Sequence, residues 1–439
     1  MRLFLTLFAA LLVAPPALAE TTAIVNVNVI PMTSEIVLDA QTVLIEDGTI
    51  VAIGNVDLVP VPEAAELIDG TDRYLMPGLT EMHGHVTGTG EAQINRLFSL
   101  FLANGVTTVR GMLGRQSHLQ LREDIAAGRV FGPRLVTSGP SFNGNSVSGA
   151  AQGASMVREQ HAAGYDFLKI HPGLSQDEFY AIADVANELG IPFAGHVPVA
   201  VGIAGVLEKG MATIDHLDGY MASLLPPNTD TSGGYGGFFD VMLADQVIEE
   251  RIADVVAATL VAGVGNVPTE TLFEQVVNDV PPGDLANRFE TRYVSAATVR
   301  QWQRSKEQTL GERGFDPLVA AQAIDIRRRL ILALHEAGAV LLLGSDAPQI
   351  FNVPGFSLHH ELEFLVAAGL TSYEALRTGT SAPARFFGIN TGTVEVGRIG
   401  DLVLLDANPL ADIGNSSRVH GVLVAGRWVT AAELLEGLE

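Results

Sequence analysis

The central part of the chain alternates short apolar segments with longer amphipathic ones, and this alternation limits the folds available to it. An amphipathic stretch from Gln176 to Leu189 leads into the apolar run Ile191-Pro-Phe-Ala-Gly. A second one, from Ala320 to Ala337, leads into Ala339-Val-Leu-Leu-Leu-Gly. Strands that alternate with helices in this way pair in parallel, because each helix carries the chain back to the starting edge of the sheet. The pattern predicts an α/β fold.

Eight candidate strands follow one another along the chain, which is the number that a closed (β/α)8 barrel requires. We expect them to end near His85, Met112, Ser138, His171, His196, His216, Pro268 and Asp346. In a TIM-like barrel the chemical groups lie at the carboxyl ends of the strands. The main domain is therefore predicted to be such a barrel over residues 76–389.

The two ends of the chain are richer in strands than the middle. The N-terminal part carries alternating or β-branched apolar runs, with the hairpin turn signal Asp47-Gly48 between two of them. Runs of the same kind return near the C-terminus, as in Val419-His-Gly-Val-Leu-Val. We expect the two ends, residues 20–75 and 390–439, to pair into a small β-sandwich domain.

The first residues match the layout of a secretory signal peptide. Arg2 gives one positive charge, Leu3 to Val13 is apolar, and the small-x-small segment Ala17-Leu18-Ala19 follows. A membrane anchor needs about 20 apolar residues, and Pro15-Pro16 interrupts this segment earlier. We expect residues 1–19 to be removed and the mature protein to be periplasmic or secreted.

The chain is strongly acidic, with 26 Lys and Arg against 50 Asp and Glu and a net charge of −24. Such a charge repels phosphate backbones and anionic membrane surfaces, so we expect no nucleic-acid partner and no membrane partner. Hydrophobic residues make up 47% of the chain and charged ones 17%, which is typical of a globular protein with a buried core. The expected partners are a small-molecule substrate and further copies of the chain, in a homo-oligomer whose number of subunits the sequence does not predict.

His83-Gly84-His85 is the clearest candidate for a metal site. Two histidines at positions i and i+2 of a strand point to the same side of the backbone, so both imidazoles can reach one ion. The pair alone is weak, because H-x-H arises by chance. Other candidate residues stand at or near the ends of later strands: Lys169, His196, His216 and Asp346. Neutral imidazoles and carboxylates suit Zn²⁺ or similar divalent ions.

These residues, in this order, resemble the pattern of the amidohydrolase superfamily. Its members have H-x-H after strand 1, a lysine on strand 4, histidines on strands 5 and 6, and an aspartate on strand 8. The segments Met76-Pro-Gly-Leu-Thr-Glu-Met-His-Gly-His and Gly392-Thr-Val-Glu-Val-Gly-Arg-Ile-Gly-Asp also fit, so the resemblance covers essentially the whole mature chain. It is strongest for the imidazolonepropionase-like branch that keeps the strand-4 lysine, which includes metal-dependent dipeptidases and ochratoxin-type amidases.

Two positions qualify the resemblance. True imidazolonepropionases use one metal ion and no such lysine, so Lys169 argues against that reaction. Glu81 stands where many relatives have an aspartate just before the histidine pair.

The resemblance implies a binuclear metal centre. A lysine ammonium has no lone pair for a metal, but Lys169 carboxylated by CO₂ would bridge two divalent ions, expected to be Zn²⁺. A hydroxide shared by the two ions would be the nucleophile near neutral pH, because metal binding lowers the pKa of water. Asp346 would take its proton and deliver it to the leaving nitrogen. The more buried ion would be held by His83, His85 and Asp346, and the more exposed one by His196 and His216.

The implied activity is metal-dependent hydrolysis of an amide bond, in an N-acyl amino acid or a dipeptide. A substrate carboxylate would need a local set of donors in so acidic a protein. Arg110 would grip it with two parallel hydrogen bonds, although a structural salt bridge is an equal alternative. Tyr220 would add a third donor, or else pack as an aromatic residue.

Other residues carry weaker expectations. Gly233 to Phe239, with its four glycines, is predicted to be a mobile loop. His171 alternates with Lys169 and faces the same side, with a small chance of a ligand role. His359 and His360 open a helix predicted from Leu358 to Ala368, where they are expected to be capping or surface residues.

Two other classes of function stay open. The same site would hydrolyse a lactone or another ester, because a metal-bound hydroxide attacks amides and esters alike. A non-catalytic binding protein of this fold would have lost metal ligands, and none is missing from the sequence.

The signal-like start generates a direct test of export. Native protein isolated from the periplasm or medium of a Gram-negative-type cell is expected to begin at Glu20, after cleavage behind Ala19. N-terminal sequencing measures this. A native chain that begins at Met1 would refute export.

Overall fold

The computed structural model describes residues 21–229, 231 and 238–438. The predicted signal peptide lies outside the described residues, and so does most of the predicted mobile loop. In the described part of the chain, no helix has the length and apolar character needed to cross a membrane.

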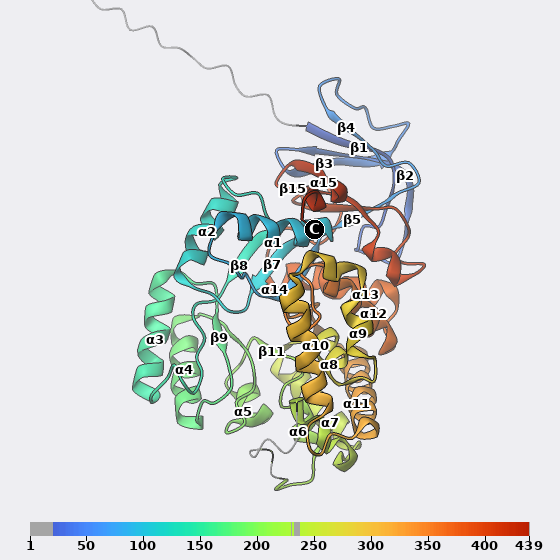
Figure 1. Ribbon diagram of the computed structural model, residues 1–439. Helices are drawn as coiled ribbons and strands as arrows, with labels where there is room; N and C mark the ends of the chain where they lie inside the picture. The colour runs from blue at the N-terminus through green and yellow to red at the C-terminus, as the bar shows by residue number, and fades with distance from the viewer. Residues whose placement is uncertain (1–20, 230, 232–237, 439) are drawn as a thin grey trace, which may run out of the picture.

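One mixed sheet brings the two ends of the chain together. Figure 1 shows its blue N-terminal strands beside its red C-terminal ones at the top of the molecule. The strand order is β16-β15-β14-β5-β1-β2-β3, with β4 paired to β1. Its members are β1 (Thr21–Val29), β2 (Leu38–Glu46), β3 (Thr49–Asn55), β4 (Glu66–Asp69), β5 (Tyr74–Pro77), β14 (Leu402–Leu405), β15 (Val419–Val424) and β16 (Arg427–Thr430).

Local sequence explains how this sheet is assembled. Asp47 and Gly48 have φ angles of 48° and 73°, the left-handed conformation that a tight hairpin turn demands, and they connect β2 to β3. The chain ends meet where β5 pairs antiparallel with β14, which places Leu75 opposite Leu404. Both leucines belong to one buried aliphatic cluster of the sheet. A division of these strands into the two layers of a sandwich stays a prediction.

Eight short parallel strands occupy the centre of the molecule. They are β6 (Leu79–Gly84), β7 (Val106–Gly111), β8 (Arg134–Thr137), β9 (Leu168–Ile170), β10 (Phe193–Gly195), β11 (Thr213–Asp215), β12 (Gly265–Val267) and β13 (Val340–Leu341). The first seven stop directly before the residues at which the sequence predicted their ends. The last stops at Leu341, so Asp346 lies on the loop after β13 instead of on the strand.

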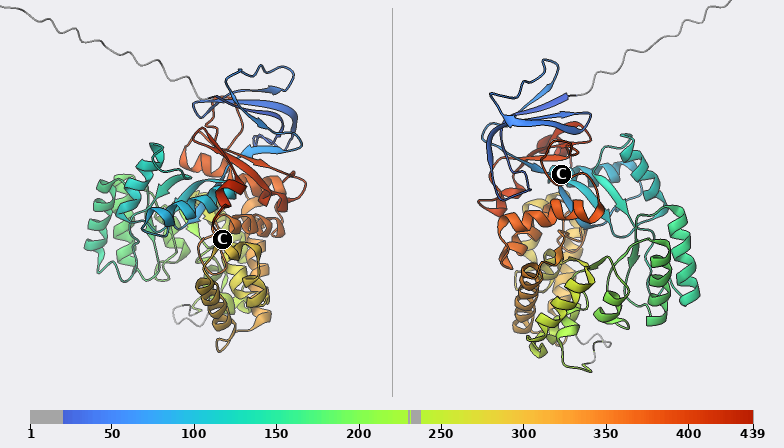
Figure 2. Two further views of the ribbon diagram at one scale, coloured as in Figure 1. Left: turned by 45° about the horizontal axis from the view of Figure 1, so that its top comes forward. Right: turned by 180° about the vertical axis from the view of Figure 1, so that it is seen from behind.

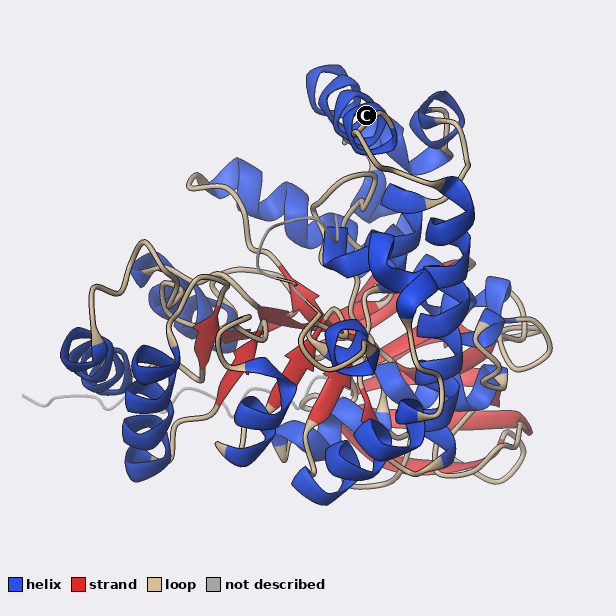
Figure 3. Cartoon of the chain, turned by 90° about the horizontal axis from the view of Figure 1, so that it is seen from below, coloured by secondary structure: helices blue, strands red, loops and turns tan. Residues whose placement is uncertain are grey.

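The parallel strands form two sheets that meet at both edges. Strands β6 to β8 make one sheet and β9 to β13 the other. A parallel bridge joins Ser138 to Phe167 at one junction, and another joins Gly84 to Ala347 at the opposite one. Figure 3 shows these strands in the middle of the molecule with helices around them. The arrangement is consistent with a TIM-type barrel.

Helices follow the strands and cover them. They are α1 (Glu91–Ala103), α2 (Gln116–Ala126), α3 (Ala150–Ala163), α4 (Gln176–Leu189), α5 (Gly202–Glu208), α6 (Tyr220–Leu224), α7 (Arg251–Ala262), α8 (Glu270–Val277), α9 (Pro282–Ala286), α10 (Ala296–Leu310), α11 (Pro317–Glu336), α12 (Phe356–Ala367), α13 (Ser372–Gly379), α14 (Ser381–Phe387) and α15 (Ala431–Leu435). Short 3₁₀ turns are η1 (Phe238–Gln246), η2 (Phe289–Tyr293) and η3 (Ile413–Ser417). The views in Figure 2 keep the terminal strands at one end of this helical body.

Helix α4 shows why the predicted boundaries hold. Ser175 caps its first turn in a capping box with Glu178, and Gly190 ends it in the left-handed conformation. The apolar side chains of α4 face the core, where Phe179 and Ile182 are fully buried. The predicted helix and the observed one have the same bounds.

Helix α12 corrects one expectation. His359 was predicted to be a capping or surface residue, but it is 4% exposed. Its ring nitrogens lie 3.0 Å from Ser416 Oγ and 3.1 Å from the carbonyl oxygen of Asn104. The prediction was wrong because η3, more than fifty residues further along the chain, packs on this helix. His360 stays at the partly exposed edge, where Nε2 is 3.0 Å from Glu290 Oε1.

Candidate metal centre

The predicted metal ligands gather at one cavity. It has a volume of about 420 Å³ and opens where the parallel strands end. Five of the six predicted ligands line its wall: His83, His85, His196, His216 and Asp346. The sixth, Lys169 on β9, is fully buried. The structure therefore brings together side chains from four strands and a loop that span more than half of the sequence.

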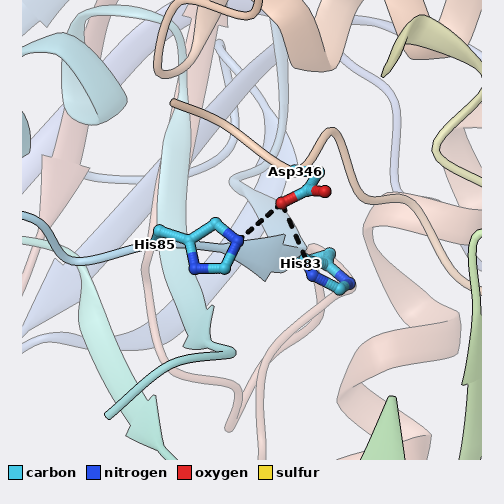
Figure 4. Close-up of side chains that lie close together, drawn as sticks. All are labelled: His83, His85 and Asp346. Carbon is cyan, nitrogen blue, oxygen red and sulfur yellow. Dashed lines mark hydrogen bonds and ion pairs between the residues drawn. The ribbon is translucent and has the colours of Figure 1, made fainter. Parts of the chain in front are cut away.

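His83, His85 and Asp346 form the tightest part of the cluster. Nε2 of His85 is 2.6 Å from Asp346 Oδ1, and Nε2 of His83 is 3.5 Å from the same oxygen. Figure 4 shows both rings directed at this one carboxylate. One ligand atom from each residue lies within 4.8 Å of the others, a spacing that can hold a metal ion.

The backbone holds Asp346 in place. Its φ angle is 60°, a left-handed value that few non-glycine residues adopt, and its amide donates to the carbonyl of His83 over 2.8 Å. That bond fixes the loop after β13 to the end of β6. Strain of this kind persists only where surrounding contacts impose it, and it concentrates at functional sites.

His196 and His216 complete the ring of histidines. The ring centre of His216 lies 4.5 Å from that of His83 and 4.6 Å from that of His196. His216 Nδ1 is 3.9 Å from Asp346 Oδ2. The two halves of the predicted ligand set are therefore neighbours, with His216 between them.

Lys169 is buried without a hydrogen-bond partner. Its Nζ makes no hydrogen bond to any described residue, and the carboxylate oxygen paired with it, Asp215 Oδ2, is 3.9 Å away. Burial lowers the pKa of Lys169 to about 8. An unsatisfied buried amine destabilises a folded protein. A buried nitrogen without a hydrogen-bond partner is consistent with a further covalent group on the amine of Lys169.

Gly195 leaves the space that Lys169 needs. Its φ angle is 126°, and a Cβ at this position would lie 2.4 Å from the carbonyl oxygen of Ile170 and 3.1 Å from Lys169 Nζ. Only glycine allows His196 to follow β10 so closely beside the lysine.

Three oxygen-bearing side chains that the sequence analysis did not assign lie beside the Nδ1 atoms of the histidines. The pairs are His83 Nδ1 with Asp215 Oδ2 at 2.9 Å, His196 Nδ1 with Asp218 Oδ2 at 3.1 Å, and His216 Nδ1 with Thr269 Oγ1 at 2.8 Å. When Nδ1 is hydrogen-bonded, as in His196 and His216, Nε2 is the nitrogen left for a metal. The available signal was the acidic residues directly beside a candidate ligand, in Asp215-His216-Leu217-Asp218.

Glu81 connects the two segments that carry the tight cluster. It is fully buried, and its carboxylate accepts hydrogen bonds from the amide of His83 (2.8 Å) and from the amide and hydroxyl of Ser345. Burial raises the pKa of Glu81 to about 7. The position singled out in the sequence therefore aligns β6 with the loop that bears Asp346.

Arg110 and Tyr220 do not reach the cavity wall. Arg110 is 1% exposed, and its guanidinium lies 3.1 Å from Asp215 Oδ1, which is the structural salt bridge that the sequence left open. Tyr220 is fully buried, and its hydroxyl lies 2.6 Å from Asn266 Oδ1. Arg110 reaches from β7 to Asp215 on β11, and Tyr220 of α6 reaches Thr259 on α7 and Asn266 on β12, so both side chains are part of the core.

Other side chains shape the rest of the wall. Arg115, which follows β7, is the one arginine or lysine among the described lining residues, and the sequence analysis missed it. The ring of Phe239 lies 5.4 Å from that of His216 and is nearly parallel to that of His196. His171 also lines the cavity; burial lowers its pKa to about 3, so its imidazole is neutral.

Comparison with known proteins agrees with this geometry. A model of the amidohydrolase family matches residues 74–429. Enamidase from Eubacterium barkeri is 22% identical over 396 residues, which cover 89% of this chain and 86% of the enamidase. The chain belongs to the amidohydrolase family, as its motifs indicated.

Solved structures share the fold. That of a Xaa-Pro dipeptidase with bound methionine in the active site has a TM-score of 0.67 at 19% identity, covering 94% of this chain and 100% of the dipeptidase. That of ochratoxinase from A. niger has a TM-score of 0.65 at 19% identity, covering 94% and 96%. Members of this family are enzymes that act on small molecules, and the His83, His85 and Asp346 cluster is a possible metal site of this chain.

The oxygen partners generate a prediction about metal affinity. In Asp218→Ala, His196 loses the carboxylate that holds Nδ1, so the variant is expected to bind Zn²⁺ about 10- to 100-fold more weakly. Competition with a chromophoric chelator measures the affinity. Asp184→Ala is the control, because Asp184 is 63% exposed and pairs with Lys209 at the surface. Equal Zn²⁺ affinity in both variants would contradict the role of Asp218.

Proposed function

We propose that the protein is a binuclear metal-dependent hydrolase that cleaves an amide bond, in an N-acyl amino acid or a dipeptide. The observation that carries the proposal is the unpartnered, buried amine of Lys169 beside four histidines and an aspartate. The names of the relatives favour C–N bonds, since they include a dipeptidase and an enamidase. The eight parallel strands are proposed to close into a (β/α)8 barrel that carries this site, and residues 1–19 to direct export.

The residues fit two divalent ions, proposed to be Zn²⁺. His83, His85 and Asp346 would hold one ion, and His196 and His216 the other. Addition of CO₂ to the ammonium group of Lys169 forms a carbon–nitrogen bond and releases two protons, which turns a buried cation into an anion. That anion would be the shared ligand, and it would satisfy the orphaned nitrogen. Imidazole and carboxylate donors are those that zinc prefers.

The chain's own groups would move the proton. Bound metal ions would supply Lewis acidity, polarising the carbonyl and making water a better nucleophile. Asp346 accepts a proton from the attacking water and passes it to the leaving nitrogen, so that the amine departs neutral. The hydrogen bond from the Asp346 amide to the His83 carbonyl would keep this carboxylate at the cavity wall.

Metal content tests the ligand assignment. Purified wild-type protein is expected to contain close to two divalent ions per chain, and Lys169→Ala about one or none, because the shared ligand is lost. Elemental analysis after mild dialysis measures the content. Lys209→Ala, which removes a surface lysine, should match the wild type. One ion per wild-type chain together with full activity of Lys169→Ala would exclude the binuclear arrangement.

The proton-transfer role of Asp346 is tested by turnover. Asp346→Asn keeps the size of the side chain but cannot accept the proton, so kcat is expected to fall by at least about 10²-fold. The assay is hydrolysis of N-acyl amino acids and dipeptides by metal-loaded protein, with lactones and aryl esters in parallel. Circular dichroism checks that the variant is folded. Turnover near that of the wild type would remove Asp346 from the mechanism.

A further inference from the structure

Arg115 lies at the cavity wall and has no acidic partner among the described residues. No carboxylate of a described residue lies within 4.0 Å of its guanidinium, whereas Arg110 before it and the next three arginines after it are ion-paired. Those pairs are Arg110 with Asp215, Arg122 with Asp166, Arg129 with Asp124, and Arg134 with Asp401. No acidic group of the described residues therefore neutralises Arg115, although the chain has a net charge of −24.

The position of Arg115 is tied to the metal-site segment. One terminal nitrogen donates to the carbonyl of Val86 over 3.3 Å, and this is its single side-chain hydrogen bond to a described residue. Val86 directly follows His85, so the guanidinium is anchored beside a predicted ligand. The remaining donors of its planar fork are available to a bound group.

The cavity around this cation also has an apolar part. Leu113, Leu272 and Ile350 line the same wall, and Leu113 is 44% exposed although it is a large hydrophobic residue. Asp346 and five imidazoles are among the polar groups of the same wall. A cavity of this composition suits a ligand with an apolar body and one anionic group.

We propose that Arg115 recognises a carboxylate on the substrate and that the enzyme selects amides bearing one. The inference rests on the proposed hydrolase function and names the residue that chooses among amides. A guanidinium binds a carboxylate through two parallel hydrogen bonds. Arg110, the earlier candidate, is unsuited because Asp215 already neutralises it inside the core.

Paired substrates test the proposal through kinetics. N-acetylphenylalanine and its C-terminal carboxamide differ only in the carboxylate, and release of acetate reports the same bond in both. Arg115→Met is expected to lower kcat/KM for the free acid by about 10- to 100-fold and to leave the carboxamide nearly unchanged. Arg129→Met is the control, because it removes the same charge from an exposed arginine paired with Asp124. An equal fall for both substrates, or none, would overturn the proposal.

A binding measurement separates this proposal from the catalytic one. Titration calorimetry with 3-phenylpropionate and 3-phenylpropionamide needs no turnover. Wild type and Arg129→Met are expected to bind the acid about 10- to 100-fold more tightly than the amide, and Arg115→Met to lose that preference. Retained preference in Arg115→Met, or none in the wild type, would refute carboxylate recognition. If neither acetyl substrate is hydrolysed while the preference holds, the hydrolase proposal fails and the anion subsite stands.

Discussion

The site depends on one buried carboxylate, that of Asp215. It lies 2.9 Å from His83 Nδ1, 3.1 Å from the guanidinium of Arg110 and 3.9 Å from Lys169 Nζ, and it also accepts a hydrogen bond from Thr213. Burial alone would raise its pKa, but the positive charges of Arg110 and Lys169 hold it below the ordinary value. Removing one partner from such a group leaves an uncompensated charge in the core. Asp215 therefore lies between two buried cations of the parallel strands, Arg110 and Lys169, and the candidate metal ligand His83.

At their carboxyl ends, the strands place the candidate metal ligands at the wall of the cavity. His216 has a φ angle of 64° and Asp346 one of 60°, so the chain turns sharply at each and presents the side chain to the cavity. Gly195 performs the same turn before His196, where a larger residue would strike the backbone of β9. The buried strands and the strained turns at their ends together fix the positions of the site residues before a ligand binds.

Two arginines only five residues apart have opposite surroundings. Arg110 lies inside a strand and meets Asp215, which is more than a hundred positions away in the sequence. Arg115 lies beyond the same strand, and its side chain hydrogen-bonds only to the carbonyl of Val86 among the described residues. Arg115 has no acidic partner among the described residues and lies at the cavity wall, so it marks the place where an external anion would be bound. Neither surrounding can be inferred from composition or spacing.

Periodicity and strand-end residues predicted the α/β order, the ends of seven strands and the hairpin at Asp47-Gly48, because these depend on interactions between near neighbours along the chain. The motif order also predicted which residues gather at the cavity, since the carboxyl ends of parallel strands share one edge. The sequence did not reveal the roles of Asp218 and Thr269, the burial of His359 or the partners of Arg110 and Arg115. Those depend on which segments distant in the sequence pack together, and only the tertiary structure determines that packing.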